Sequence, residues 1–165
     1  MTRNMSDGNP FPHDDPDRRA IWEMLVRRDI EAFAAGDWDA HFEDFAPELF
    51  FGIDGRFSDN PDLWRVTYAD LDRYRERWLG ASTDMVAQIA RDDLERALFA
   101  LTSLRNIELV NDFAMARKKF DGAVPLRTGE TVTMRWQTLY FCRRIDSRWR
   151  IAGFLGYLPN PMGTP

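Results

Sequence analysis

A carboxylate on an apolar helix face is the sequence feature best suited to chemistry. Between Asp17 and Gly36 apolar residues recur at three- and four-residue steps, and on a helical wheel Asp29 falls in the middle of that stripe. Burying an ionised carboxylate alone is costly, so Asp29 must be paired, protonated or exposed to a wet cavity. The position therefore suits a general acid or base, or one half of a salt bridge with an arginine such as Arg117.

The sequence contains further candidate functional residues besides this carboxylate. His41 follows Asp37 in a short predicted helix, where an imidazole can transfer protons near neutral pH or simply pack as a helix side chain. Arg117 lies on a predicted strand and could bind an acidic ligand group, pair with Asp29 or face solvent. We therefore take Asp29 and His41 as candidate catalytic residues. The candidate ligand-binding residues, whose aromatic members would equally suit a plain core, are Trp22, Phe33, Trp38, Tyr74, Trp78, Arg117, Trp136 and Tyr140.

Composition excludes several classes of function. The chain has 165 residues and a net charge of −5, which disfavours a broad electrostatic grip on nucleic acid or anionic lipid. Its one cysteine, Cys142, excludes a cysteine-cluster metal site, and the separation of His13 from His41 argues against a histidine-rich one. We accordingly predict no metal and no cofactor.

The ends of the chain differ in character from its middle. The N-terminal stretch is polar and rich in proline, without the apolar core of a signal peptide, and no run approaches the ~18 apolar residues that cross a bilayer. These features predict a cytoplasmic protein with no membrane partner. We expect a flexible arm at 1–16, a single domain at 17–158 and a short tail at 159–165.

Helical patterns fill the first half of the chain and strand patterns the second. This order predicts an α+β domain with a curved, mostly antiparallel sheet wrapped around the N-terminal helices. Segment 81–95 is ambiguous between helix and loop, and 56–66 is typical of a loop. We expect helices at 17–36, 37–46 and from Asp70 to about Gly80, and strands at 49–53, 98–110, 113–120, 131–144 and 149–157.

Several of these segments also resemble a known family. The first helix runs into Ala35-Gly36-Asp37-Trp38-Asp39, and the second half contains Thr102-Ser103-Leu104-Arg105-Asn106, Asn111-Asp112-Phe113-Ala114-Met115-Ala116-Arg117 and Trp149-Arg150-Ile151-Ala152-Gly153. Over 17–158 this pattern resembles the nuclear-transport-factor-2-like superfamily, which includes SnoaL-like polyketide cyclases and ketosteroid isomerases.

The resemblance carries expectations about fold and site. It implies a cystatin-like cone with a deep apolar pocket between the first helices and the concave sheet, and dimers that form through the outer sheet face. In ketosteroid isomerases an oxyanion-binding tyrosine lies eight residues before the aspartate of a similar Gly-Asp pair, a position occupied here by Asp29. The position of the isomerase base holds Ile53, beside Asp54, so both positions depart from the isomerase pattern.

Three functions remain open from the sequence. The first is a protein that binds a small, largely apolar molecule as a cofactor-independent isomerase, cyclase or dehydratase of SnoaL-like type, with Asp29 as acid or base. The second is a non-catalytic ligand-binding or interaction protein, and the third the small structural subunit of a ring-hydroxylating dioxygenase. We also expect a homodimer, because Leu139 and Phe141 share the outer face with Arg135 and Gln137.

Overall fold

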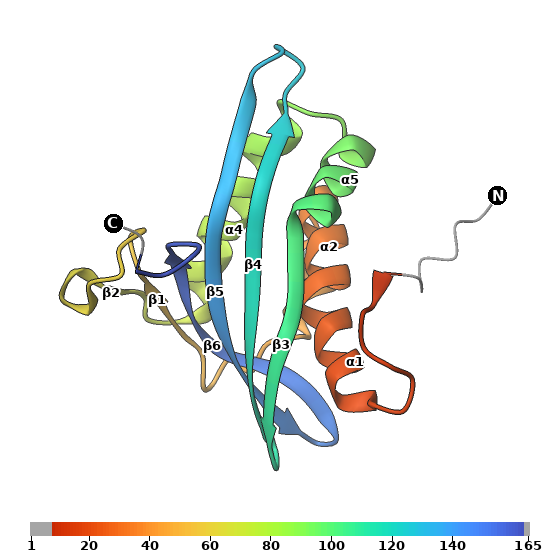
Figure 1. Cartoon of the computed structure of the whole chain (residues 1–165), viewed down its shortest axis with the longest axis vertical. Helices are drawn as coiled ribbons and strands as arrows, with labels where there is room; N and C mark the ends of the chain where they lie inside the picture. The colour runs from red at the N-terminus through yellow and green to blue at the C-terminus, as the bar shows by residue number, and fades with distance from the viewer. Residues whose placement is uncertain (1–7, 164–165) are drawn as a thin grey trace.

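The computed structural model describes residues 8–163 and shows an α+β arrangement, as predicted. The helices lie against one face of a curved sheet (Figure 1). Its strands are β1 (Phe51–Asp54), β2 (Arg65–Tyr68), β3 (Thr102–Val110), β4 (Phe113–Pro125), β5 (Thr131–Ile145) and β6 (Arg148–Leu158). They are ordered β2-β1-β6-β5-β4-β3, and every neighbouring pair is antiparallel except β1 with β6.

The first helix contains an irregular middle turn. It comprises α1 (Pro16–Trp22), a π-helical segment η2 (Glu23–Arg28) and α2 (Asp29–Ala35). It ends where predicted, at Gly36, whose φ of 67° is left-handed. A π turn holds more residues than an α turn, so side chains before and after η2 do not keep the common face that regular helical spacing predicts.

The next helices differ from the prediction mainly in their ends. α3 (Trp38–Phe42) is shorter than expected, whereas α4 (Leu71–Val86) begins after the predicted cap Asp70 and continues through Gly80. The predicted end at Gly80 is wrong, because glycine costs a helix only about 1 kcal/mol relative to alanine.

The last helix occupies sequence that was partly predicted as strand. The ambiguous segment 81–95 is helical at both ends, in α4 and in α5 (Arg91–Leu101). α5 also takes the residues from Leu98 to Leu101, so β3 begins only at Thr102. Leu94, Leu98 and Leu101 are all buried, and their three- and four-residue spacing gives α5 an apolar face toward the core.

The long hairpin of β4 and β5 extends beyond its predicted length. A turn was expected at Asp121-Gly122, but these residues pair with Arg135 and Met134 of β5. At Gly122 a Cβ atom would lie 2.7 Å from the Cβ of Leu101, so glycine here allows α5 to approach the strand. The expected loop at 56–66 likewise holds a short 3-10 helix, η3 (Pro61–Leu63), and the start of the edge strand β2.

Strand register decides which side chains of β4 face the helices. Thr138 and Tyr140 of β5 lie on the inner face and pair with Lys118 and Ala116 of β4. Partners across a ladder share a face, so Lys118 also points inward and its neighbour Arg117 outward.

The chain ends fall partly outside the described residues. Residues 1–7 of the predicted arm and residues 164–165 of the tail are not among those described. Within 8–163, no helix combines the length and apolar character needed to cross a bilayer.

Candidate functional site

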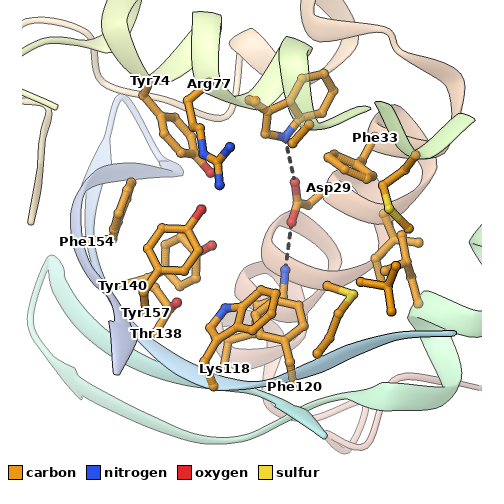
Figure 2. Close-up of a pocket in the computed structure, with 18 of the residues that line it drawn as sticks. Asp29, Phe33, Tyr74, Arg77, Lys118, Phe120, Thr138, Tyr140, Phe154 and Tyr157 are labelled. Carbon is orange, nitrogen blue, oxygen red and sulfur yellow. Dashed lines mark hydrogen bonds and ion pairs between the residues drawn. The ribbon is translucent and has the colours of Figure 1, made fainter. Parts of the chain in front are cut away.

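A cavity of about 260 Å³ lies between α2, α4 and the inner face of β4, β5 and β6 (Figure 2). Most of its wall is aromatic or aliphatic, as is usual for small-molecule sites. The apolar side chains that line it are Ile30, Phe33, Trp78, Ala81, Met85, Leu98, Phe120, Val132, Met134, Trp136 and Phe154. The polar ones are Asp29, Tyr74, Arg77, Lys118, Thr133, Thr138, Tyr140 and Tyr157.

Asp29, the first residue of α2, is bound from two sides (Figure 2). Lys118 donates a hydrogen bond from Nζ to Oδ2 at 2.7 Å, and Trp78 donates from Nε1 to Oδ1 at 3.3 Å. The side chain of Asp29 remains 20% exposed and lines the cavity. One carboxylate therefore combines a buried salt bridge with access to the cavity.

Electrostatics keep this carboxylate ionised. Burial raises the pKa of Asp29, but the charge of Lys118, the nearby His41 and the hydrogen bonds from Lys118 and Trp78 lower it by more. The net effect is a pKa below the ordinary value of 3.8. At neutral pH Asp29 is thus able to accept a proton.

Lys118 joins the sheet to the first helix. Its side chain is 1% exposed, and Nζ donates hydrogen bonds both to Asp29 and, at 2.5 Å, to the carbonyl oxygen of Leu25. The ammonium also lies 5.2 Å from the ring centre of Phe120, within cation–π range. Lys118 therefore has little freedom to move away from the carboxylate.

The buried His41 lies between Asp29 and a second carboxylate, that of Asp44. Nε2 of His41 is 3.3 Å from Oδ1 of Asp29, and Nδ1 is 3.4 Å from Oδ2 of Asp44. Arg28 and Arg148, both about two-fifths exposed, contact Oδ1 of Asp44 at 2.8 and 3.1 Å. A row of ionisable groups thus runs from the cavity wall to the surface.

The environment of Asp44 also perturbs its acidity. Burial raises the pKa of this carboxyl, while His41 and the Arg28 guanidinium lower it by more, to about 2. Asp44 is therefore a stable anion that anchors His41 on the side away from the cavity.

Hydrogen-bond donors gather at the opposite side of the cavity from Asp29. Figure 2 shows Arg77 and the hydroxyls of Tyr140 and Tyr157 directed toward the cavity. Burial is the main cause that raises the pKa of Tyr140 and of Tyr74 well above the ordinary value, so both hydroxyls stay protonated. Arg77 forms no ion pair with a carboxylate among residues 8–163, and Tyr157 and Tyr68 raise its pKa.

The structure brings together most of the residues that the sequence singled out. Four predicted site residues lie elsewhere. Trp38 is buried in the core, His41 lies behind Asp29, and Trp22 borders a separate hollow because the π turn rotates it away from Asp29. Arg117 lies on the outer face, so the suggested pair of Asp29 with Arg117 is wrong and Lys118 takes that place. The residues that do line the cavity are Asp29, Phe33, Tyr74, Trp78, Trp136 and Tyr140.

Sequence reasoning missed Lys118, Arg77 and Tyr157. Lys118 could have been found from the register of the hairpin, since assigning Leu139 to the outer face leaves its neighbour Thr138, the partner of Lys118, on the inner face. Arg77 immediately precedes Trp78 in a charged helix, and nothing in that pattern separates it from the solvent-facing arginines. Among residues 8–163, no group of three or more His, Cys, Asp or Glu side chains is placed to hold a metal ion.

Comparison with known proteins bears on the fold. No family model matches the sequence, and neither does any curated protein. Several solved structures do match. An NTF2-like superfamily protein from Salmonella enterica serovar Typhimurium superposes with a TM-score of 0.53 at 15% identity, covering 82% of this chain and 86% of its own. A protein of unknown function with a cystatin-like fold from Nostoc punctiforme gives a TM-score of 0.52 at 14% identity, covering 88% of this chain and 92% of its own.

A third match agrees with these two. An NTF2-like protein with a cystatin-like fold from Novosphingobium aromaticivorans gives a TM-score of 0.51 at 18% identity, covering 87% of this chain and 82% of its own. The chain has the NTF2-like fold. The resemblance expected from the sequence is confirmed at this level, and the NTF2-like fold by itself names no reaction.

Proposed function

We propose that the cavity binds a small, largely apolar molecule and that Asp29 transfers a proton of that molecule, as in an isomerisation, cyclisation or dehydration. The observation that carries this proposal is the ionised Asp29 carboxylate on the wall of an otherwise mainly apolar cavity. Perturbed titratable groups in such surroundings are candidates for catalysis.

The distribution of polar groups favours a ligand that carries an oxygen atom. Rings and aliphatic side chains surround the middle of the cavity and suit an apolar body of one or two rings. Arg77 and the hydroxyls of Tyr140 and Tyr157 offer donors to a carbonyl or hydroxyl oxygen on the side away from Asp29. A ketone or hydroxyketone meets both requirements.

The chemistry follows from the state of Asp29. Its carboxylate takes a proton from the carbon next to a carbonyl, the electron pair of that C–H bond forms a C=C bond, and the π pair of the C=O bond moves onto the oxygen to give an enolate. Return of the proton to another carbon completes an isomerisation, whereas loss of a neighbouring hydroxide, protonated as it leaves, completes a dehydration. Because Lys118 lowers the pKa of Asp29, the base is weak and the substrate proton must already be acidified by a carbonyl.

His41 supports this step without touching the cavity. It lies between Asp29 and Asp44 and is absent from the cavity wall, so we assign it as a positioning residue that fixes the orientation of the carboxylate. This refines the interpretation of His41 as an acid or base that itself contacts the ligand.

One observation favours a second candidate, a non-catalytic binding protein. Lys118 already satisfies one oxygen of Asp29 at 2.7 Å, which is what a purely structural salt bridge would do. The two candidates share the cavity and differ in whether the bound molecule exchanges a proton.

Both candidate functions require that the cavity binds a small molecule, and binding of a small ketone tests this requirement. We expect 2-tetralone to quench protein fluorescence, because Trp78 and Trp136 line the cavity. Ala81→Trp fills the cavity from α4 and should abolish the quenching, whereas Ala87→Trp, at an exposed position after α4, should leave it intact. Equal quenching in both variants would contradict binding in this cavity.

A further inference from the structure

A second hollow lies between the first helix, α5 and β3. It measures about 290 Å³ and shares no lining residue with the cavity of Asp29. Its apolar walls are Trp22 and Val26 from the first helix, Phe99 from α5 and Leu104 from β3.

Two buried polar atoms at this hollow lack a partner. Nη2 of Arg27 and Oγ1 of Thr102 are buried and form no hydrogen bond within the part of the chain that the structure describes. Only two other buried side-chain atoms of residues 8–163 share that condition, and neither belongs to this hollow. A buried donor without a partner is costly, and both of these atoms belong to side chains that line the hollow, so an acceptor bound there would relieve that cost.

The Arg27 guanidinium is held in a fixed position. Nε of Arg27 bonds to Oε2 of Glu23 at 2.5 Å, and Cζ lies 5.2 Å from the centre of the Trp22 ring. The side-chain amide of Asn9 also donates to Oε1 of Glu23 at 3.0 Å, which holds the Glu23 carboxylate in place. Glu23 offsets the charge of Arg27 but leaves Nη2 without an acceptor.

Arg105 supplies the uncompensated charge. The pairing of β3 with β4 shifts between Leu104 and Asn106, so Arg105 is the extra residue of a β-bulge at the hollow. Its side chain is exposed, and it forms no ion pair among residues 8–163. The hollow therefore combines a net positive charge with hydrogen-bond donors and an aromatic wall.

We propose that this hollow is a second binding site, specific for a small carboxylate with an apolar body. The carboxylate oxygens accept hydrogen bonds from Arg27 Nη2 and the Thr102 hydroxyl, Arg105 balances the charge, and the apolar body packs on Trp22 and Phe99. A neutral molecule of the same shape lacks the charge that Arg105 attracts.

The test is a calorimetric titration with phenylacetate and its neutral counterpart phenylacetamide. We expect phenylacetate to bind at least tenfold more tightly than the amide. Thr102→Val, which removes the hydroxyl at constant shape, and Arg105→Gln, which removes the charge, should each weaken phenylacetate about tenfold. Arg117→Gln removes a cation from the outer face of β4 and should have no effect.

Two further variants locate the binding and check the free protein. Ala81→Trp blocks the cavity of Asp29, so phenylacetate binding should survive it. Thr102→Val should keep or raise the melting temperature without ligand, because it replaces an unpaired buried hydroxyl by a methyl group. Absence of binding, equal binding of the amide, or loss of binding in Ala81→Trp but not in Thr102→Val would each overturn the proposal and leave a hollow that holds water.

Discussion

At the scale of single residues, Asp29 serves stability and proposed chemistry together. Its partner Lys118 is 1% exposed, so little water reaches the ammonium to replace the carboxylate when that charge is removed. Asp29 itself remains partly open to the cavity. The two halves of the salt bridge should therefore respond unequally to substitution.

We predict that Asp29→Asn lowers the free energy of unfolding by about 3–5 kcal/mol, because it leaves Lys118 buried without a counter-charge. Lys118→Met should cost less, since the partly exposed Asp29 carboxylate can be hydrated from the cavity. The double variant Asp29→Asn/Lys118→Met should be more stable than Asp29→Asn alone. Urea unfolding of all three measures this coupling, and strictly additive losses would contradict a coupled pair.

A second prediction concerns pH and Asp44. The pKa of Asp44 is lowered from 3.8 to about 2 in the folded protein, so its stabilising contribution is complete above pH 3.8 and is lost as the pH falls toward 2. The loss amounts to about 2 kcal/mol. Urea unfolding across this interval should show a steeper decline for the wild type than for Asp44→Asn. Parallel declines would exclude the assigned interaction with His41 and Arg28.

At the scale of elements, sequence patterns correctly predicted the features that depend only on neighbouring residues, such as helix ends and strand alternation. The Asp70 cap, the Gly36 stop and the alternation along β5 all lie where the sequence placed them. The π turn η2 was not predictable, because apolar spacing alone does not record a shift in hydrogen bonding. The placement of Lys118 required the register of a hairpin, which depends on pairing between distant residues.

Two glycines offer a matched test of the sheet and of α4. At Gly153 a Cβ atom would lie 2.6 Å from the carbonyl oxygen of Phe51, so Gly153→Ala must push β1 from β6 and should cost about 1–3 kcal/mol. At Gly80 a Cβ atom meets nothing within 4 Å, so Gly80→Ala should stabilise the helix by about 1 kcal/mol. Thermal melting of the two variants should therefore move in opposite directions; the same direction for both would refute this account.

At the scale of the whole molecule, the outer sheet face carries an apolar row. Met115, Phe141, Gly153 and Phe51 are successive cross-strand neighbours on β4, β5, β6 and β1, and the two phenylalanines are 37% and 43% exposed. Gln137 lies on this face, as expected, but it is buried there and donates to the carbonyl oxygen of Pro159.

From this row we predict a twofold homodimer that buries at least about 1,000 Å² in total. Light scattering at micromolar concentration should give the mass of two chains for the wild type. Phe141→Glu should give one chain, because it places a charge in the middle of the row, while Phe57→Glu, at an exposed phenylalanine off this row, should remain dimeric. A monomeric wild type would refute the dimer.

The central claim is that the carboxylate of Asp29 moves a proton of a molecule held in the cavity. The most direct measurement is the incorporation of deuterium next to the carbonyl of 2-tetralone in D₂O, followed by NMR. The wild type and Lys118→Met, which both keep the carboxylate, should accelerate the exchange. Asp29→Asn/Lys118→Met, which strands no buried charge, should bind the ketone without accelerating it. Exchange by the double variant at the wild-type rate, or no exchange by a wild type that binds the ketone, would contradict the account.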